Sequence, residues 1–385
     1  MIAHLSQNAA LQQARHAVDP SRLMQQAIDV QQIAAPTFHE AARAAYVTMQ
    51  FASLCLADVE TDDLQNVYAR YPGQGDQRPI LVSAHTDTVF PIKTDLSIRR
   101  ETGRVYGPGL GDNSLGVAGL LRLAELLVQN EVQFPGDLWL VANVGEEGLG
   151  DLRGIRQVID RLGDKVSATI VIEGLAFGYI YHAGIAVRRY CVQAKTGGGH
   201  SWLHYGRPSA VHGLAQLTGE LATLRLPLKP RTTLNIGKLV GGTSINTIAN
   251  SAELELDLRS ENAGTLLALC SDVETLIAAA EEKYSLEIKS EICGDRPAGN
   301  ISADHPLVLL ADTVLKHVGV ENPILERGST DANIPLSCGY PAITIGLSRG
   351  GNTHRPDEFV ELQYLRAGMT QLLLLVFSAY SLQPG

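Results

Sequence analysis

The sequence has few cysteines and no long run of apolar residues. The five cysteines are Cys55, Cys191, Cys270, Cys293 and Cys338. They are scattered and form no Cys-x-x-Cys pair, so we expect reduced thiols rather than a disulfide framework. The longest aliphatic run, 372–377, is far shorter than the roughly 20 residues of a membrane span, and the N-terminus lacks the layout of a secretory signal. These absences predict a cytoplasmic protein without a membrane partner.

The sequence also has fewer basic than acidic residues. It contains 31 Lys and Arg residues and 41 Asp and Glu residues, which gives a formal net charge of −10. Such an excess of acid disfavours nucleic acid and anionic membranes as partners. With 45% hydrophobic and 19% charged residues, the composition is that of a folded protein, and 385 residues predict one to three domains.

The pattern of apolar residues predicts an α/β fold in the first half of the chain and near its end. Helical periodicity predicts helices over residues 21–34, 39–56 and 115–129. Short apolar runs predict strands at 80–84, 138–144, 168–172 and 342–345. Strand-length runs separated by helical stretches are typical of a mostly parallel sheet. Asp112, Asn113 and Ser114 precede the helix at 115 and are expected to cap its N-terminus.

Residues 187–295 follow a different order. The predicted elements are a strand at 186–194, a helix at 208–224, strands at 233–240 and 252–260, a helix at 264–282 and a strand at 285–292. This β-α-β-β-α-β order is typical of a small ferredoxin-like domain. Because the first pattern resumes near Pro341, we interpret residues 187–295 as an insertion between the two parts of a main domain, 1–186 and 296–385.

Histidine and acidic residues follow the predicted strands. They are His85, Asp87, Glu146, Glu147, Glu173 and His354, and Asp112 stands at a helix start. Ligands of open α/β sheets bind beyond the carboxyl ends of the strands, so we expect these side chains at one edge. One such residue alone is usually a solvated loop residue, but their joint placement predicts a metal site. Imidazole and carboxylate ligands suit Zn²⁺, with Mn²⁺ or Co²⁺ as weaker substitutes, and the cation offsets the repulsion between the acids.

Two other motifs suggest different chemistry and are disfavoured by their surroundings. Gly107, Gly109 and Gly111 precede a helix as in a dinucleotide site, but the preceding segment is too polar for a buried strand and Asp112 would repel a pyrophosphate. The G-x-S-x-G sequence at 346–350 is followed by a polar loop instead of the helix of a serine hydrolase.

Six motifs in order resemble the co-catalytic zinc peptidases, the family of peptidase T, aminoacylase, glutamate carboxypeptidase and succinyl-diaminopimelate desuccinylase. The motifs are SAHTDTV (83–89), GLGDNSLG (109–116), NVGEEGLG (143–150), VIEG (171–174), GGGHSW (197–202) and GGNTHRPDE (350–358). The resemblance implies a catalytic domain of 1–186 and 296–385, and a lid or dimerisation domain of 187–295 through which a homodimer forms.

The resemblance also implies two zinc ions per subunit. His85, Asp112 and Glu173 would hold one ion. Asp112, Glu147 and His354 would hold the other, which makes Asp112 the bridging carboxylate.

The remaining catalytic roles follow from the same resemblance. Glu146 would be the general base, Asp87 would orient His85, and the Asp112–Asn113 peptide bond would be cis. An Asp87 carboxylate at the second ring nitrogen would fix the His85 imidazole and raise its basicity.

In the inserted domain, His200 resembles a histidine that polarises the scissile carbonyl, in some members in the partner subunit's site. Asn246 and Arg259 align with positions that bind the substrate carboxylate. For Arg259 a salt bridge on the face of a strand is an equal alternative. The chain departs from the family at Gly198, where a proline is usual, so the lid loop is expected to differ.

The sequence therefore predicts hydrolysis of the amide bonds of small peptides, with deacylation of N-acyl amino acids as an alternative. Glu173 is more often seen in carboxypeptidase or deacylase members, whereas the segment 145–154 is closer to peptidase T, so the substrate stays open. A non-catalytic metal or peptide-binding protein on the same fold is a third hypothesis, which the presence of Glu146 disfavours.

Overall fold

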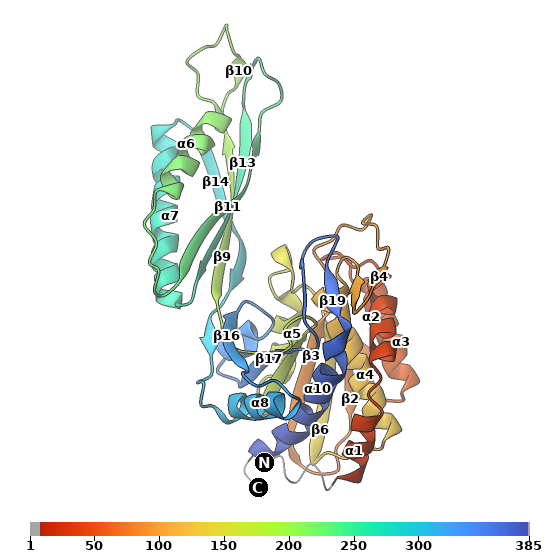
Figure 1. The fold of residues 1–385 in the computed structure, drawn as a ribbon. Coiled ribbons are helices and arrows are strands. Elements are labelled where there is room, and N and C mark those ends of the chain that lie inside the picture. Colours follow the sequence, from red (N-terminus) through yellow and green to blue (C-terminus); the bar gives the residue numbers. More distant parts are fainter. Residues whose placement is uncertain (1–7, 384–385) are drawn as a thin grey trace. The chain divides into compact units, whose positions relative to one another are not determined.

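The computed structural model describes residues 8–383, and the chain divides into two compact units. The first unit comprises Met1–Gly184 and Gly299–Gly385, and the second comprises Ile185–Ala298 (Figure 1). The second unit extends beyond the predicted insertion, 187–295, at both ends.

A nine-stranded sheet forms the centre of the first unit. Its strands are β1 (Ala57–Thr61), β2 (Val67–Tyr71), β6 (Gly136–Asn143), β3 (Gln77–His85), β7 (Ala168–Glu173), β17 (Ala342–Gly346), β8 (Tyr179–Gly184) and β15 (Gly299–Asn300) in spatial order, with β16 (Ile324–Gly328) also paired to β8. The four central strands, β6, β3, β7 and β17, run parallel, whereas β2 and β8 flank them antiparallel. The predicted α/β class with a mostly parallel central sheet is confirmed.

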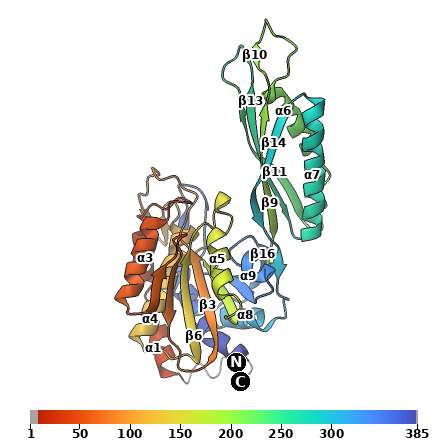
Figure 2. The ribbon, with the colours of Figure 1, turned by 180° about the vertical axis from the view of Figure 1, so that it is seen from behind.

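Helices cover both faces of this sheet. They are α1 (Ala9–His16), α2 (Pro20–Gln31), α3 (Ala41–Ser53), α4 (Gly116–Gln129), α5 (Arg153–Leu162), α8 (Pro306–His317), α9 (Asn333–Ser337) and α10 (Leu365–Ala379). Successive side chains of β3 point to opposite faces, so Ile80 and Val82 join the core beneath α4 and α10, and Leu81 joins the core beneath α5. Figure 2 shows α5 and α9 on this second face.

A smaller antiparallel sheet lies beside the segment that precedes α4. Its strands are β18 (Gly350–Gly351), β19 (Phe359–Glu361), β5 (Arg104–Tyr106) and β4 (Arg99–Glu101). The loop between β18 and β19 carries His354.

The second unit has the predicted β-α-β-β-α-β order. Its main elements are β9 (Ala186–Lys195), α6 (Ala210–Ala222), β11 (Thr232–Gly241), β13 (Ser251–Ser260), α7 (Ala263–Lys283) and β14 (Glu287–Arg296). The strands form an antiparallel sheet in the order β11-β13-β9-β14, and both helices pack on one face of it. Two short strands, β10 (Gly199–His200) and β12 (Thr247–Ile248), pair separately.

Two helical stretches, Ala263–Lys283 and Leu362–Leu382, are long and apolar enough to cross a membrane by length and composition alone. Packing accounts for most of the apolar residues of α10 and for one face of α7, where Leu267 on the other face is exposed. Helix α10 buries Leu372 and Leu375 in the core of the first unit, and α7 buries Leu266 against the sheet of the second.

The expectation of reduced thiols is wrong for one pair. Cys191 on β9 and Cys293 on β14 form a disulfide, with their Cα atoms 6.0 Å apart and a sequence separation of 102. The two strands are neighbours only because the sheet order places β14 beside β9, which no local pattern reveals. Cys55, Cys270 and Cys338 are free.

Candidate metal centre

The expected site residues of the first unit come from five segments, one of which is the loop between β18 and β19 that carries His354. His85 ends β3, Glu173 ends β7, and Glu146 and Glu147 follow β6. Because β6, β3 and β7 are parallel neighbours, their carboxyl ends meet at the same edge of the sheet. Asp112 lies in the irregular segment Leu110–Leu115 before α4.

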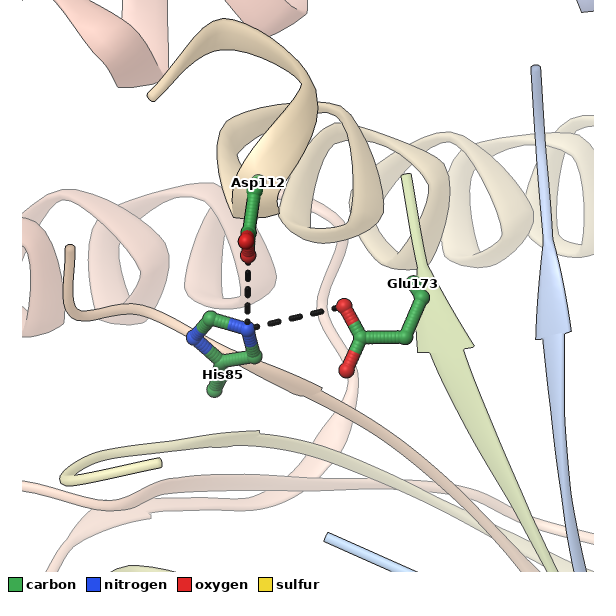
Figure 3. Close-up of side chains that lie close together, drawn as sticks. All are labelled: His85, Asp112 and Glu173. Atoms are coloured by element: carbon green, nitrogen blue, oxygen red, sulfur yellow. Dashed lines mark ion pairs between the residues drawn. The ribbon is translucent and has the colours of Figure 1, made fainter. Parts of the chain in front are cut away.

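The first group of ligand atoms comprises His85, Asp112 and Glu173. His85 Nε2 lies 3.3 Å from Asp112 Oδ1 and 3.6 Å from Glu173 Oε2 (Figure 3). The imidazole is buried, with only 1% of its surface exposed. The two carboxylates approach the same ring nitrogen from different elements, so the three atoms surround one point.

The second group comprises Asp112, Glu147 and His354. His354 Nε2 lies 3.1 Å from Asp112 Oδ2 and 3.2 Å from Glu147 Oε1. Asp112 therefore offers one oxygen to each group. Within each group the ligand atoms lie within 4.8 Å of one another, and these two groups contain all five residues expected to bind metal.

The spacing and chemistry of these atoms fit divalent cations. A tetrahedral zinc ion with bonds of about 2.0–2.1 Å separates its ligand atoms by roughly 3.3 Å. The four nitrogen–oxygen separations fall between 3.1 and 3.6 Å. Imidazole nitrogen with carboxylate oxygen is a donor set that Zn²⁺ accepts readily.

Burial and mutual contact shift the pKa values of these groups. Burial and the charge of Asp112 raise the pKa of Glu147 to about 8. Burial raises the pKa of Glu173 to about 7, although the charge of His85 opposes the shift. Hydrogen bonds with Asp112 and Glu147 raise the pKa of His354 to about 10. Protons therefore occupy the metal-free site, and a divalent cation would displace them.

Charge balance also governs His85 and Asp112. Burial alone would lower the pKa of His85, but the charge of Glu173 and hydrogen bonds with Asp112 and Asp87 raise it well above its usual value. Burial would raise the pKa of Asp112, but hydrogen bonds with His354 and His85 lower it. Asp112 is thus the carboxylate that stays ionised between the two imidazoles.

Asp87 contacts more of the site than the expected interaction with His85. Its Oδ1 lies 3.5 Å from His85 Nδ1, which is also 3.2 Å from the Asp87 backbone oxygen. The backbone N–H groups of Glu146 and Glu147 donate to its two carboxylate oxygens, each at 2.9 Å, and Thr37 Oγ1 donates to Oδ2 at 2.8 Å. Asp87 therefore sets the position of the Glu146–Glu147 segment as well as facing His85.

The sequence profile of peptidase family M20/M25/M40 matches residues 81–377. The chain belongs to this family. Membership makes it a metal-dependent peptidase or amidohydrolase, so the hypothesis of a non-catalytic binding protein is set aside. The resemblance drawn from the six motifs is confirmed.

Relatives within and around the M20 family differ in substrate. An acetylornithine deacetylase from Shigella sonnei is 23% identical over 305 residues, which cover 74% of this chain and 76% of the relative. The structure of a tripeptidase from Staphylococcus aureus superposes with a TM-score of 0.78 at 20% sequence identity. The match covers 95% of this chain and 100% of the tripeptidase chain. The structure of a dinuclear metal-binding M20 peptidase from Bacillus subtilis has a TM-score of 0.67 at 17% sequence identity. This match covers 94% of this chain and 98% of the Bacillus subtilis chain. The structural likenesses establish the shared fold.

The expected helix cap before α4 is wrong. Asp112 and Asn113 have non-helical backbone angles, and α4 begins after Leu115 without a side-chain cap. Asp112 turns to the metal centre instead, and Ser114 Oγ donates to the Gly109 carbonyl at 2.6 Å. The expected cis peptide bond between Asp112 and Asn113 is confirmed.

Three buried charged residues near the centre were not singled out from the sequence. Arg43 on α3 donates to the carbonyls of Ile33 and Thr86, at 2.7 and 2.8 Å, and so holds the N-terminal segment against the end of β3. Asp331 accepts a hydrogen bond from Asn143 Nδ2 at 2.7 Å, and burial raises its pKa well above the usual value.

Glu358 is the third of these residues. Its carboxylate accepts backbone N–H groups from both the Asp112 segment and the His354 loop. A signal for it was available, because it closes the GGNTHRPDE motif. Arg43, by contrast, lies among alanines in a predicted helix, and no motif in the sequence marked it as a buried residue near the site.

The expected catalytic residue His200 and the expected substrate-binding residues Asn246 and Arg259 lie in the second unit. His200 on β10 is exposed, and its Nδ1 accepts from the Trp202 backbone at 3.2 Å. The Asn246 carbonyl accepts from the Ser201 backbone at 3.0 Å, so Asn246 lies close to His200. Arg259 on β13 pairs with Asp257, with Nε 2.6 Å from Oδ1, which is the strand-face salt bridge that the sequence left open.

Proposed function

We propose that the protein is a dinuclear zinc hydrolase that cleaves amide bonds of small peptides. The observation that carries this proposal is the Asp112 carboxylate, which offers one oxygen to each of two histidine–carboxylate groups. Mn²⁺ or Co²⁺ would substitute for Zn²⁺, because the donors are nitrogen and oxygen rather than thiolate.

The residues around the centre divide the work of hydrolysis. When bound, the metal ions supply Lewis acidity, which polarises the scissile carbonyl and lowers the pKa of the attacking water. The Glu146 carboxylate takes a proton from this water and delivers it to the nitrogen of the leaving amine. Asp87 holds the Glu146 backbone so that the carboxylate keeps its position during both transfers.

The second unit is proposed to supply substrate contacts. In this proposal His200 polarises the scissile carbonyl, Asn246 binds the substrate carboxylate, and Arg259 joins it after leaving Asp257. The proposal includes a homodimer formed through residues 187–295. A cytoplasmic location stays a prediction, and the Cys191–Cys293 disulfide counts against it because disulfides persist mainly in oxidising compartments.

Deacylation of N-acyl amino acids is the second candidate. The acetylornithine deacetylase relative favours it, and so does the glutamate at position 173, whereas the tripeptidase likeness favours peptides. Both reactions break an amide bond with the same metal ligands and base, so only the groups that bind the rest of the substrate distinguish them.

A panel assay tests both candidates. The purified protein is loaded with Zn²⁺, Mn²⁺ or Co²⁺ and incubated with dipeptides, tripeptides and N-acetyl amino acids. We expect turnover, with free-amine peptides cleaved faster than N-acetyl amino acids. The reverse preference would support deacylation, and metal binding without turnover of any substrate would contradict the proposed function.

The variant E146Q tests the base. It should keep two metal ions per chain and lose roughly 10²–10⁴-fold in kcat, the usual contribution of general acid–base catalysis. E321Q, which changes an exposed glutamate outside the centre, is the matched control and should leave kcat unchanged. Near-normal turnover of metal-loaded E146Q would exclude Glu146 as the base.

A further inference from the structure

The segment that carries the shared ligand Asp112 is not held by regular helical hydrogen bonds. Asp112 has φ −106° and ψ 97°, and Asn113 has φ −126° and ψ 34°, so both residues depart from helical geometry. The position of the Asp112 carboxylate must therefore be set by other contacts. Two buried side chains, from Glu358 and Asn113, provide them on opposite sides of the segment.

Glu358 connects the Asp112 segment to the His354 loop. Its side chain is fully buried. Oε1 accepts the backbone N–H groups of Gly111 and Asp112, at 2.7 and 3.0 Å, and Oε2 accepts the N–H of His354 at 3.4 Å. His354 has a left-handed backbone with φ 67°, which is costly for a residue with a side chain and persists only when neighbouring groups hold it. Glu358 thus contacts the backbone of two of the three ligands of the second group.

Asn113 connects the same segment to the end of β7. Its Nδ2 donates to the Ile172 carbonyl at 2.9 Å, and its Oδ1 accepts the Gly174 N–H at 2.9 Å. These two backbone groups flank Glu173, and the Asn113 side chain is fully buried. Since Asn113 is covalently joined to Asp112, it links two of the three ligands of the first group.

We propose that Glu358 and Asn113 are positioning residues that each serve one metal site. Glu358 sets the metal affinity of the second group, and Asn113 sets that of the first group. Each residue reaches the other group only through Asp112, so its effect there is smaller. This inference rests on the proposed two-metal centre and goes beyond it, because it assigns a separate determinant of affinity to each site. Residues behind metal ligands typically contribute 10- to 100-fold to metal affinity.

The test measures metal affinity one group at a time. E173Q removes a ligand of the first group, and H354A removes a ligand of the second, so each background retains one complete group. E358Q and N113A are then added separately to both backgrounds. Zn²⁺ dissociation constants are measured by competition with a chromophoric chelator, and Co²⁺ absorption spectra report the ligand geometry.

We expect a crossed pattern. E358Q should weaken Zn²⁺ binding by about 10- to 100-fold in the E173Q background and by clearly less in the H354A background. N113A should weaken Zn²⁺ binding by about 10- to 100-fold in the H354A background and by clearly less in the E173Q background. A general structural defect would not produce this pattern, because it would weaken both groups alike. Circular dichroism of each metal-free variant checks folding, and N113D, which keeps the acceptor for the Gly174 N–H, replaces N113A should that variant not fold.

Three distinguishable results would contradict, in turn, the separate assignment of the two residues, their positioning role and the two-metal centre. Equal weakening of both groups by either variant would overturn the separate assignment. Affinities unchanged within about threefold in every background would overturn the positioning role altogether. Absence of Zn²⁺ binding in the folded E173Q and H354A backgrounds, without any further change, would instead contradict the two-metal centre itself.

Discussion

Replacing Asp87 with asparagine is a sensitive test of how the centre is built. The Asp87 carboxylate is fully buried and accepts hydrogen bonds from the backbones of Glu146 and Glu147 and from the Thr37 hydroxyl. Burial would raise its pKa, but the interactions with His85 and with these N–H groups outweigh burial and lower it. The folded protein therefore favours the charged form.

The magnitude follows from the number of donors. Asparagine has the shape of aspartate but one acceptor oxygen instead of two, so either the Glu146 or the Glu147 N–H must face an NH₂ group. A buried donor left without an acceptor costs about 1–3 kcal/mol, and the remaining bonds lose the strength that the charge adds. We expect D87N to lower the free energy of unfolding of the metal-free protein by about 2–4 kcal/mol.

Urea denaturation followed by circular dichroism at pH 7 measures this change. The matched control is D95N, because Asp95 is exposed and also accepts bonds from a backbone N–H and a hydroxyl, both of Ser97, at 2.9 and 2.6 Å. Exposed substitutions usually change stability by less than about 0.5 kcal/mol. If D87N were no more destabilising than D95N, the idea that the Asp87 charge organises the Glu146–Glu147 segment would be refuted.

Two other predictions concern protons and packing. The pKa values of His354 and Glu147, about 10 and about 8, exceed their ordinary values of 6.5 and 4.5, so the folded metal-free protein binds extra protons. The stability that these two groups contribute should therefore be fully present below about pH 4.5 and should be lost as the pH rises towards about 10. Zn²⁺ binding at pH 7 should release protons, which calorimetry in buffers of different ionisation enthalpy detects; a buffer-independent enthalpy would contradict it. A Cβ at Gly174 would lie 1.9 Å from the Gly111 carbonyl oxygen, so G174A should cost at least about 2 kcal/mol and weaken Zn²⁺ binding, whereas G197A, with open space around it, should do neither.

The shared carboxylate explains why the centre tolerates so many buried acids. Asp112 stays ionised between two imidazoles, whereas burial, with a smaller contribution from the charge of Asp112, raises the pKa values of Glu147 and Glu173. Without a cation, protons compensate the charge; with two cations, the same donors become ligands. The site is therefore organised for metal binding before any metal arrives.

Local patterns in the sequence were sufficient for much of this architecture. The parallel strands, the β-α-β-β-α-β insertion and the polar residues at the strand ends were all predicted, because apolar periodicity reports which face of an element is buried. The order of the six motifs identified the family. These features depend on neighbours within a few residues, or on a pattern shared with known proteins.

Contacts between distant segments were decided only by the tertiary structure. The disulfide between Cys191 and Cys293 depends on which strands are neighbours in the sheet. Asn113 was expected to cap a helix but bonds the end of β7, and the role of Glu358 depends on a loop that lies beside the Asp112 segment. Hydrogen bonding and charge pairing act over a few ångströms in space whatever the separation along the chain. Such partners therefore become visible only once the fold has brought them together.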